Sequence, residues 1–497
     1  MSNSILRRLS TAAGVLALSA AAAFVAVAPA AAVTQPGNID PAIARTITIH
    51  KFALGPENGQ QIGTGQEVTV PGTPLAGATF TAALVQGVDL TTAEGWTAVS
   101  NLTPATAASR VITADTYTAT TGSTGVARFN DGATLPIGLY LVTETVLPAG
   151  ATNPAAPFLV TLPFPTGSDG APSNQWIYDV HAYPKNAVTD LTKTRVPAPA
   201  NSVEARNPDL IRWAINQSVP TLAAGTTLDA FTLTDSLPVE LEYLATGPDG
   251  VAPTSVRVTD AAGGVQSFVA GTDYTLVYDA ATRNLTATFT PAGLTRLSTL
   301  PEGDVTLTVL SRAVTIPADG FITNTATGVV NGSSTTVAGR TPIGQLTVFA
   351  FQNGGRTPLA GAGYEVFLNQ NDADLGQNAV FIDGIQYWTT GANGRVEIPI
   401  ITPGNYYVRE MTPPAGFQLP RPSWAAVRVV AGPSSTVAPV RNYVEFTHDQ
   451  VPAFALPLTG GDGALWFTVG GVGLIAIALG TGVLAARRRA KPALAGV

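Results

Sequence analysis

The chain has 497 residues, with 26 basic and 33 acidic side chains and a net charge of −7. This length corresponds to about three domains, and the mildly acidic balance argues against a basic nucleic-acid-binding protein. There is no cysteine, which excludes disulfide bonds, cysteine-ligated zinc and thiol catalysis. The three histidines, His50, His181 and His448, are widely spaced and leave little material for a metal centre or a catalytic triad. We therefore expect no enzymatic active site, no cofactor and no metal.

Residues 1–32 have the three parts of a secretory signal. Arg7 and Arg8 form a basic start, an apolar stretch follows from about residue 12 to residue 27, and small residues occupy positions 28–32. We expect cleavage near Ala32 and exclude the segment from the fold. The protein is therefore predicted to be exported.

The rest of the exported part is rich in Thr, Val, Gly and Pro, and short alternating runs recur between turn residues, which is typical of all-β sandwich domains. Three blocks recur in the same order: 73–78 as 357–362, 121–125 as 390–394, and 138–144 as 404–410. Residues 33–187 and 342–450 are therefore interpreted as two copies of one module. We call them the N-terminal and C-terminal modules, and the β domain between them, 188–341, the middle module.

Lysines and acids lie on the apolar faces of several predicted strands, because successive strand residues face opposite sides of a sheet. Each of these polar residues shares its predicted face with the apolar residue two positions before it: Lys51 with Ile49, Glu144 with Val142, Lys193 with Leu191, Asp235 with Leu233, and Asn324 with Ile322. Burying such groups is costly unless they are paired. One reading is a set of buried ion pairs. The other is an isopeptide bond, since burial favours a neutral lysine amine and a neutral acid, and a held geometry supplies effective molarities of about 10⁵ M or more.

The C-terminal end, 456–497, holds three elements in strict order. A five-residue motif comes first, Leu456-Pro457-Leu458-Thr459-Gly460. An uncharged apolar run then covers 464–486, and a basic cluster with Lys491 follows. The run is long enough to span a membrane as a helix, and the cluster would stay in the cytoplasm.

An ordinary membrane anchor is one interpretation of this end, but the order of its elements resembles a sortase cell-wall sorting signal. The resemblance implies cleavage between Thr459 and Gly460. Thr459 would then be held as a thioester until an amine releases it.

Further motifs extend the resemblance over the whole chain. Residues 176–185 run from Trp176 through Val180 to Tyr-Pro-Lys, the blocks 140–144 and 406–410 read Tyr-x-Val-x-Glu, and 233–238 resemble an acid-bearing strand. These features are similar to the pilin motif, the E boxes and the middle domain of actinobacterial-type major shaft pilins, which class C sortases polymerise. The resemblance implies tandem immunoglobulin-like domains of the collagen-adhesin type, CnaB-like in the outer modules and CnaA-like in the middle module.

The resemblance assigns roles to the lysines. Lys185 would be the nucleophile that joins the Thr459 carboxyl of another subunit. The predicted alternation supports this, because Trp176, Tyr178, Val180 and Asn186 share one face, whereas Asp179, His181 and Lys185 share the other and would face solvent. Two internal bonds are then expected, Lys51–Asn186 promoted by Glu144 and Lys193–Asn324 promoted by Asp235.

The C-terminal module departs from this pattern. Ala350 aligns with Lys51, and the sequence has no lysine between residues 194 and 490. Arginine stays protonated and cannot replace the amine. We therefore expect no isopeptide bond here, with Glu410 and Asn442 at most hydrogen-bonded to each other.

The expected partners are a class C sortase, a housekeeping sortase, other copies of the chain, minor or tip pilins, and peptidoglycan; no nucleic acid is expected. The predicted location is the cell wall and surface, with a role in adhesion whose receptor the sequence does not identify. A monomeric wall-anchored adhesin is the alternative, since it would keep the sorting signal without needing Lys185. A surface enzyme is disfavoured, because no region offers paired carboxylates or a triad. Residues 369–374 carry oxygen atoms that could bind a hard cation. They lack the spacing of an EF-hand, and polar loops of this kind are common.

Overall fold

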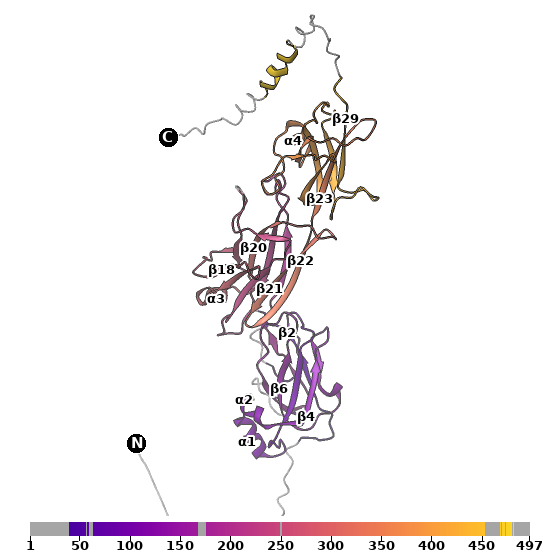
Figure 1. Cartoon of the computed structure of the whole chain (residues 1–497). Coiled ribbons are helices and arrows are strands. Elements are labelled where there is room, and N and C mark those ends of the chain that lie inside the picture. The colour runs from indigo at the N-terminus through magenta and orange to yellow at the C-terminus, as the bar shows by residue number, and fades with distance from the viewer. Residues whose placement is uncertain are drawn as a thin grey trace, which may run out of the picture. The chain divides into compact units, whose positions relative to one another are not determined.

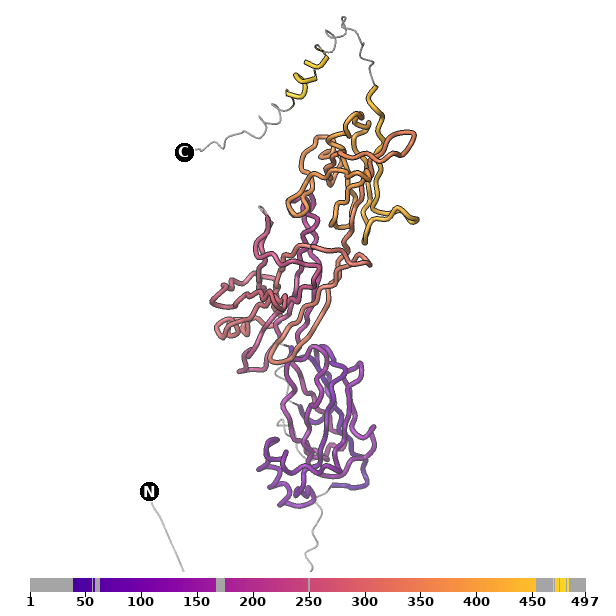
Figure 2. The backbone as a smooth tube through the Cα atoms, in the orientation of Figure 1, coloured from indigo at the N-terminus to yellow at the C-terminus, as the bar shows by residue number. Residues whose placement is uncertain are grey.

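The computed structural model describes residues 39–55, 57–58, 63–166, 175–248 and 251–452, together with 468, 470–472, 474–479 and 481. The chain divides into two compact units, Met1–Val188 and Thr189–Val497. In the described parts of both units strands dominate and helices are short, so the fold is all-β (Figure 1). The backbone passes through all strands of the first unit before it enters the second (Figure 2).

The first unit is a two-sheet sandwich. One sheet has the strand order β10-β1-β5 and the other β4-β3-β6-β7, while the short pairs β2-β11 and β8-β9 lie outside them. Its elements are β1 (Thr46–His50), β2 (Phe52–Ala53), β3 (Thr79–Val85), α1 (Ala93–Asn101), α2 (Pro104–Ala107), η1 (Ala108–Arg110), β4 (Val111–Thr120), β5 (Val126–Arg128), η2 (Phe129–Gly132), β6 (Gly138–Val146), β7 (Phe158–Leu162), β8 (Phe164–Pro165), β9 (Trp176–Ile177), β10 (Asp179–Ala182) and β11 (Lys185–Asn186). Alternating apolar residues of the two sheets form one core, which includes Ile47, Ile49, Phe80, Tyr140 and Val142.

The second unit begins with the middle module, which contains two larger antiparallel sheets. Their strand orders are β12-β13-β20-β16-β17, with β15 also on β20, and β18-β19-β14-β21-β22. The elements are β12 (Leu191–Val196), β13 (Leu210–Ser218), β14 (Phe231–Ser236), β15 (Leu241–Tyr243), β16 (Ser255–Thr259), β17 (Val265–Gln266), β18 (Tyr274–Asp279), β19 (Asn284–Phe289), α3 (Pro291–Leu297), β20 (Asp304–Ala313), β21 (Phe321–Val330) and β22 (Ser333–Pro342).

The C-terminal module repeats the strand order of the N-terminal module. Its sheets are β29-β23-β26 and β25-β24-β27-β28, and in both modules the first strand pairs in parallel with a strand from the end of the module. The elements are β23 (Gly344–Gln352), β24 (Gly363–Phe367), α4 (Gln370–Leu375), β25 (Trp388–Thr389), β26 (Arg395–Ile401), β27 (Gly404–Thr412), β28 (Trp424–Val429) and β29 (Tyr443–His448).

The repeated sequence blocks have the same local structure in both modules. Tyr140 and Tyr406 each donate a hydroxyl hydrogen bond of 2.8 Å to the carbonyl four residues earlier. Gly125 and Gly394 both have positive φ, and a Cβ at either would lie 2.5 Å from a backbone oxygen, that of Lys51 or Ala350 respectively. The two modules can therefore be compared residue by residue.

Candidate cross-link sites and the linking lysine

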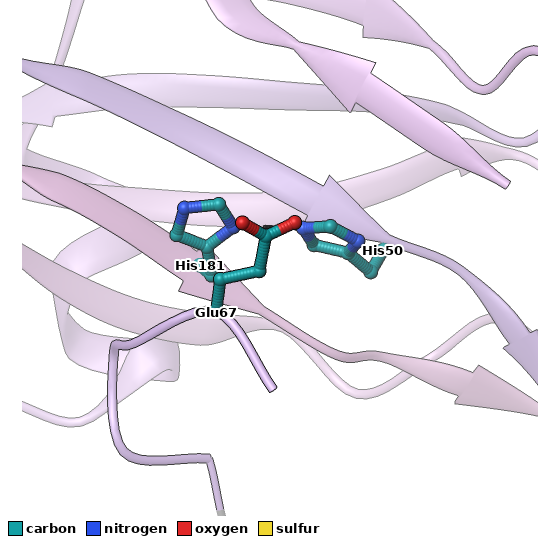
Figure 3. Close-up of side chains that lie close together, drawn as sticks. All are labelled: His50, Glu67 and His181. Atoms are coloured by element: carbon teal, nitrogen blue, oxygen red, sulfur yellow. Dashed lines mark hydrogen bonds between the residues drawn. The ribbon is translucent and has the colours of Figure 1, made fainter. Parts of the chain in front are cut away.

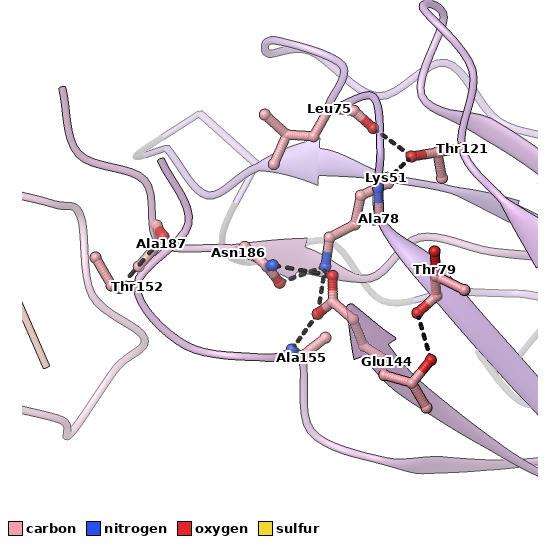
Figure 4. Close-up of polar contacts among 11 residues, drawn as sticks. Lys51, Leu75, Ala78, Thr79, Thr121, Glu144, Thr152, Ala155, Asn186 and Ala187 are labelled. Carbon is pink, nitrogen blue, oxygen red and sulfur yellow. Dashed lines mark hydrogen bonds and ion pairs between the residues drawn. The ribbon is translucent and has the colours of Figure 1, made fainter. Parts of the chain in front are cut away.

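Lys51, Glu144 and Asn186 meet inside the N-terminal module. Lys51 follows β1, Glu144 lies on β6, and the parallel pairing of β11 with β2 brings Asn186 beside Lys51. The Lys51 Nζ donates to the Asn186 Oδ1 and lies 3.1 Å from the Glu144 Oε2, while the Asn186 Nδ2 donates to the Glu144 Oε1 at 3.0 Å (Figure 4). The exposed fractions of the three residues are 0%, 6% and 1%. The carboxyl thus contacts both the amine and the carboxamide.

The surroundings shift Lys51 toward the neutral amine. Burial lowers the pKa of Lys51 to about 8, although the charge and hydrogen bond of Glu144 oppose this shift. The Phe80 ring, whose centroid is 5.3 Å from the Nζ, supplies part of the apolar surroundings. A neutral amine in contact with an amide carbonyl is the arrangement that nucleophilic attack requires.

A second triad lies inside the middle module. Lys193 on β12 places its Nζ 2.6 Å from the Asp235 Oδ1 on β14, and the Asn324 Nδ2 on β21 lies 3.4 Å from the Asp235 Oδ2. All three side chains are buried, and burial lowers the pKa of Lys193 to about 8 and raises the pKa of Asp235. The Asn324 Oδ1 is buried without a hydrogen-bond partner in the described part of the chain. Asp235 therefore connects the amine to the carboxamide.

The third site, in the C-terminal module, has Ala350 where it is expected, and the hydrogen bond that was at most expected between Glu410 and Asn442 is not formed. Ala350 does occupy the lysine position, because its N–H bonds the Gly394 carbonyl as that of Lys51 bonds Gly125. However, Glu410 does not bond Asn442. The Asn442 side chain bonds the backbone of Val430 and Gly432, at distances between 2.7 and 3.0 Å. Asn442 comes just before β29, which is too early along the chain for its side chain to reach Glu410.

His448 occupies the position that corresponds to Asn186. It pairs with Gln352 as Asn186 pairs with Ala53. The His448 carbonyl accepts from the Asn353 N–H, as the Asn186 carbonyl accepts from the Leu54 N–H. The His448 Nε2 lies 2.7 and 2.9 Å from the two Glu410 carboxylate oxygens, and its Nδ1 lies 3.3 Å from the Phe351 carbonyl. Both residues are 0% exposed. A histidine thus satisfies the buried acid.

Lys185 and Asn186 are neighbours with different surroundings. Asn186 is buried in the triad, whereas Lys185 is half-buried and lines a cavity of about 450 Å³ together with Phe158, Val160 and Tyr183. Burial lowers the pKa of Lys185, which raises the fraction of neutral amine. Lys185 therefore lines a cavity, whereas Asn186 belongs to the triad.

The solvent face expected for the 176–185 stretch is only partly correct. Asp179 is exposed and Val180 is buried, as the alternation predicts, but His181 is 7% exposed. The reason is a segment from another part of the module, since the His181 N–H donates to the Gly65 carbonyl at 2.9 Å. The segment thus pairs with β10 at His181, and this residue is buried where the alternation predicts solvent.

The polar stretch 369–374 falls at the start of α4. Asn369 caps the helix, and its side chain also donates to Asp372. Asp372 accepts a second side-chain hydrogen bond from Asn378, and Asp374 accepts one from the Trp424 indole. The oxygen atoms of this stretch thus take part in capping and packing of the helix.

Most of the predicted sorting signal lies outside the described residues. This holds for all five residues of its motif, Leu456, Pro457, Leu458, Thr459 and Gly460, and for most of the predicted span 464–486. The predicted signal segment 1–32 also lies outside them. Within the described residues no helix is long and apolar enough to cross a membrane. The roles of both ends therefore stay predictions.

Comparisons with known proteins agree with this architecture. A family model described as Gram-positive pilin subunit D1, N-terminal domain, matches residues 44–187, and one described as a prealbumin-like fold domain matches 344–437. Solved structures with the same fold include the full-length major pilin SpaD of Corynebacterium diphtheriae (TM-score 0.63, 23% identity, 84% of this chain and 99% of that one). Another is the fimbrial protein FimP of Actinomyces oris (TM-score 0.54, 23% identity, 83% and 99%).

Two curated relatives are similar over nearly their whole length. Fimbrial subunit type 2 of Actinomyces naeslundii is 30% identical, with 97% of this chain and 96% of the relative covered. Fimbrial subunit type 1 of Actinomyces viscosus is 29% identical, with 92% and 93% covered. The chain therefore belongs to the family of Gram-positive fimbrial, or pilin, subunits of the actinobacterial type.

Proposed function

We propose that the protein is the shaft subunit of a covalent cell-surface pilus in which Lys185 links one subunit to another. The observation that carries the proposal is the pair Lys185 and Asn186: the asparagine is buried beside Lys51, while the adjacent lysine lines a cavity and has a lowered pKa. A neutral amine that an enzyme can reach is what resolution of a thioester needs. The Leu-Pro-Leu-Thr-Gly sequence at 456–460 supplies the acyl side.

The linkage is a transfer in two steps. A class C sortase thiol attacks the Thr459 carbonyl, the Thr459–Gly460 bond breaks, and the fragment that begins with Gly460 leaves with the proton. The Lys185 Nζ of a second subunit then attacks the thioester, an amide forms, and the sortase thiol is released. A housekeeping sortase would join the last subunit to peptidoglycan, and minor or tip pilins would enter by the same chemistry. The subunit is thus a substrate and not an enzyme.

The internal bonds Lys51–Asn186 and Lys193–Asn324 complete the proposal. In each, the neutral lysine amine attacks the asparagine carbonyl carbon, an amide forms, and ammonia leaves with the lysine proton. Glu144 and Asp235 contact both reactants, so each can hydrogen-bond the carboxamide and transfer the proton. Bonds of this kind would staple an exported protein that has no cysteine.

Immunoblotting of wall extracts from cells that express substituted chains tests the intersubunit link. The wild-type chain should give a ladder of high-mass species, and Lys185→Arg should abolish it, because arginine keeps the charge but stays protonated. Lys193→Arg is the matched control, since it removes an internal bond and should keep the ladder. A single monomer-sized band from the wild-type chain would instead support the monomeric wall-anchored adhesin.

A further inference from the structure

Two of the three histidines meet although 131 positions separate them. The His50 Nε2 at the end of β1 lies 2.8 Å from the His181 Nδ1 on β10. The Glu67 carboxylate joins them from the segment before β3, and the three possible ligand atoms lie within 4.8 Å of one another (Figure 3). The wide spacing in the sequence was therefore misleading, because it concealed a cluster of two imidazoles and one carboxylate.

The fold holds all three side chains in place. In the parallel pair β1-β10, Thr48 is opposite His181, so His50 lies two residues further along on the same face. The segment that carries Glu67 is fixed on both sides of it. The His181 N–H donates to the Gly65 carbonyl at 2.9 Å, and the Val68 N–H donates to the Tyr183 hydroxyl at 2.6 Å. Glu67 is thus an exposed ligand on an anchored backbone.

The outer contacts of the two imidazoles suit a metal centre. The His181 Nε2 lies 3.4 Å from the Asp179 carboxylate, which favours a proton on that nitrogen and leaves the Nδ1 lone pair facing the cluster. Asp179 itself accepts from the Thr46 hydroxyl and lies 3.8 Å from the Arg128 guanidinium. The His50 ring stacks on Tyr183, with centroids 4.7 Å apart.

We propose that His50, Glu67 and His181 bind one divalent transition metal ion of the zinc class. Two imidazole nitrogens and one carboxylate oxygen are a common zinc ligand set, with water in the fourth position, whereas Ca²⁺ and Mg²⁺ prefer oxygen ligands alone. In the metal-free cluster the His50 Nε2–H donates to the His181 Nδ1. Metal binding moves that proton to the His50 Nδ1, so both facing nitrogens become ligands without a net change in protonation.

The site also adjoins the cavity of Lys185. Gly63, Gly65, His181 and Tyr183 line that cavity, so an ion bound by Glu67 and the two histidines would tie the 63–68 segment to the strand that leads to Lys185. This consequence rests on the proposed function, but metal binding itself does not. Lys185→Arg should therefore bind the ion like the wild-type chain even though it forms no ladder.

Calorimetric titration of the chelator-treated protein with ZnCl₂ tests the site, and CoCl₂ absorption reports the ligand geometry. We expect one Zn²⁺ per chain and intense visible bands of tetrahedral Co²⁺. Glu67→Gln, at an exposed position that cannot disturb the core, should weaken binding by about tenfold or more. Glu94→Gln, an exposed acid on α1, is the matched control and should bind like the wild-type chain.

Three results would overturn the proposal. The first is no Zn²⁺ uptake by the wild-type chain, which would make the cluster a hydrogen-bonded histidine pair only. The second is full affinity in both His50→Asn and Glu67→Gln, which would place the ion elsewhere. The third is tighter binding of Ca²⁺ or Mg²⁺ than of Zn²⁺, which would exclude nitrogen ligands.

Discussion

The N-terminal and C-terminal modules have the same sandwich but differ at two of three equivalent buried positions. The first has Lys51, Glu144 and Asn186, and the second has Ala350, Glu410 and His448. The acid is present in both, but only the first module has an amine and a carboxamide beside it. Without an amine and a carboxamide no amide can form beside the acid, so the buried acid needs another partner that satisfies it.

His448 meets that need without covalent chemistry. Burial raises the pKa of Glu410, and its hydrogen bonds with His448 oppose this shift. One proton on the axis between the Nε2 and the carboxylate serves both groups, and the Phe351 carbonyl can accept the other imidazole N–H. The comparison indicates that the buried acid of this sandwich can be satisfied without a covalent bond, and that the bond depends on the residues next to the acid.

The largest effect should come from breaking the proposed Lys51–Asn186 bond in the N-terminal module. Asn186→Ala removes the carboxamide but keeps the ion pair of Lys51 and Glu144. The free energy of unfolding should fall by about 5 kcal/mol, because the unfolded chain regains the entropy of a long closed loop. Chemical denaturation measures the loss. Asn442→Ala changes an asparagine outside the triads and is the control for mass. A cross-link that persists in Asn186→Ala would contradict the assignment.

A loss of about 4 kcal/mol is expected for His448→Leu, because it leaves the Glu410 carboxyl buried without the imidazole that pairs with it. Thermal and chemical unfolding of the isolated variant check this. The double variant with Glu410→Leu should recover most of the loss, since it removes the second polar group as well. Equal destabilisation in the single and double variants would show that lost packing, and not the unpaired acid, is the cause.

The pH dependence of the Asn186→Ala variant sharpens the comparison further. The pKa of Lys51 is about 8 in the fold and about 10.5 when unperturbed. Between these values the unfolded chain holds more of the proton, so stability rises with pH, by roughly 3 kcal/mol in all, and is lost as pH falls back through about 8. Unfolding curves across this range measure it. The wild-type chain, with its amine converted to an amide, should lack this component; the same rise in both chains would argue against the bond.

The smallest effect is expected from installing a bond in the C-terminal module. Ala350→Lys combined with His448→Asn recreates the triad around Glu410 and should release one ammonia. The net gain in stability should be about 2 kcal/mol, because the loop-closure contribution is offset by forcing a lysine into the packed space around Ala350. Intact mass is the readout. Ala350→Lys alone is the control, and a mass loss there would mean that the new lysine reacts with a residue other than the introduced asparagine.

Strand alternation predicted much of the site. It indicated the burial of Lys51, Lys193, Glu144, Asp235 and Asn324, and the structure buries all five. Alternation also offered a signal for His448, which shares a face with Val444 and Phe446, although Asn442 is the residue expected beside Glu410 from the sequence. Alternation describes one strand at a time, so it could not show that the 63–68 segment covers His181.

Contacts between residues far apart in the sequence were harder to predict. The contact of His50 with His181 depends on the parallel register of β1 with β10, which neither strand encodes alone. The lysine count was the more reliable guide, since chemistry that needs a primary amine cannot occur where the sequence has none. The bonds themselves, and the link through Lys185 and Thr459, stay predictions.

Mass spectrometry of the intact exported protein, followed by peptide mapping, is the sharpest test of the internal bonds. We predict a deficit of two ammonia molecules, with cross-linked peptides that join Lys51 to Asn186 and Lys193 to Asn324. No cross-linked peptide should contain Asn442 or His448. These assignments would be contradicted by no deficit, by a deficit that persists when Lys51→Ala and Lys193→Ala are combined, or by a cross-link to Asn442.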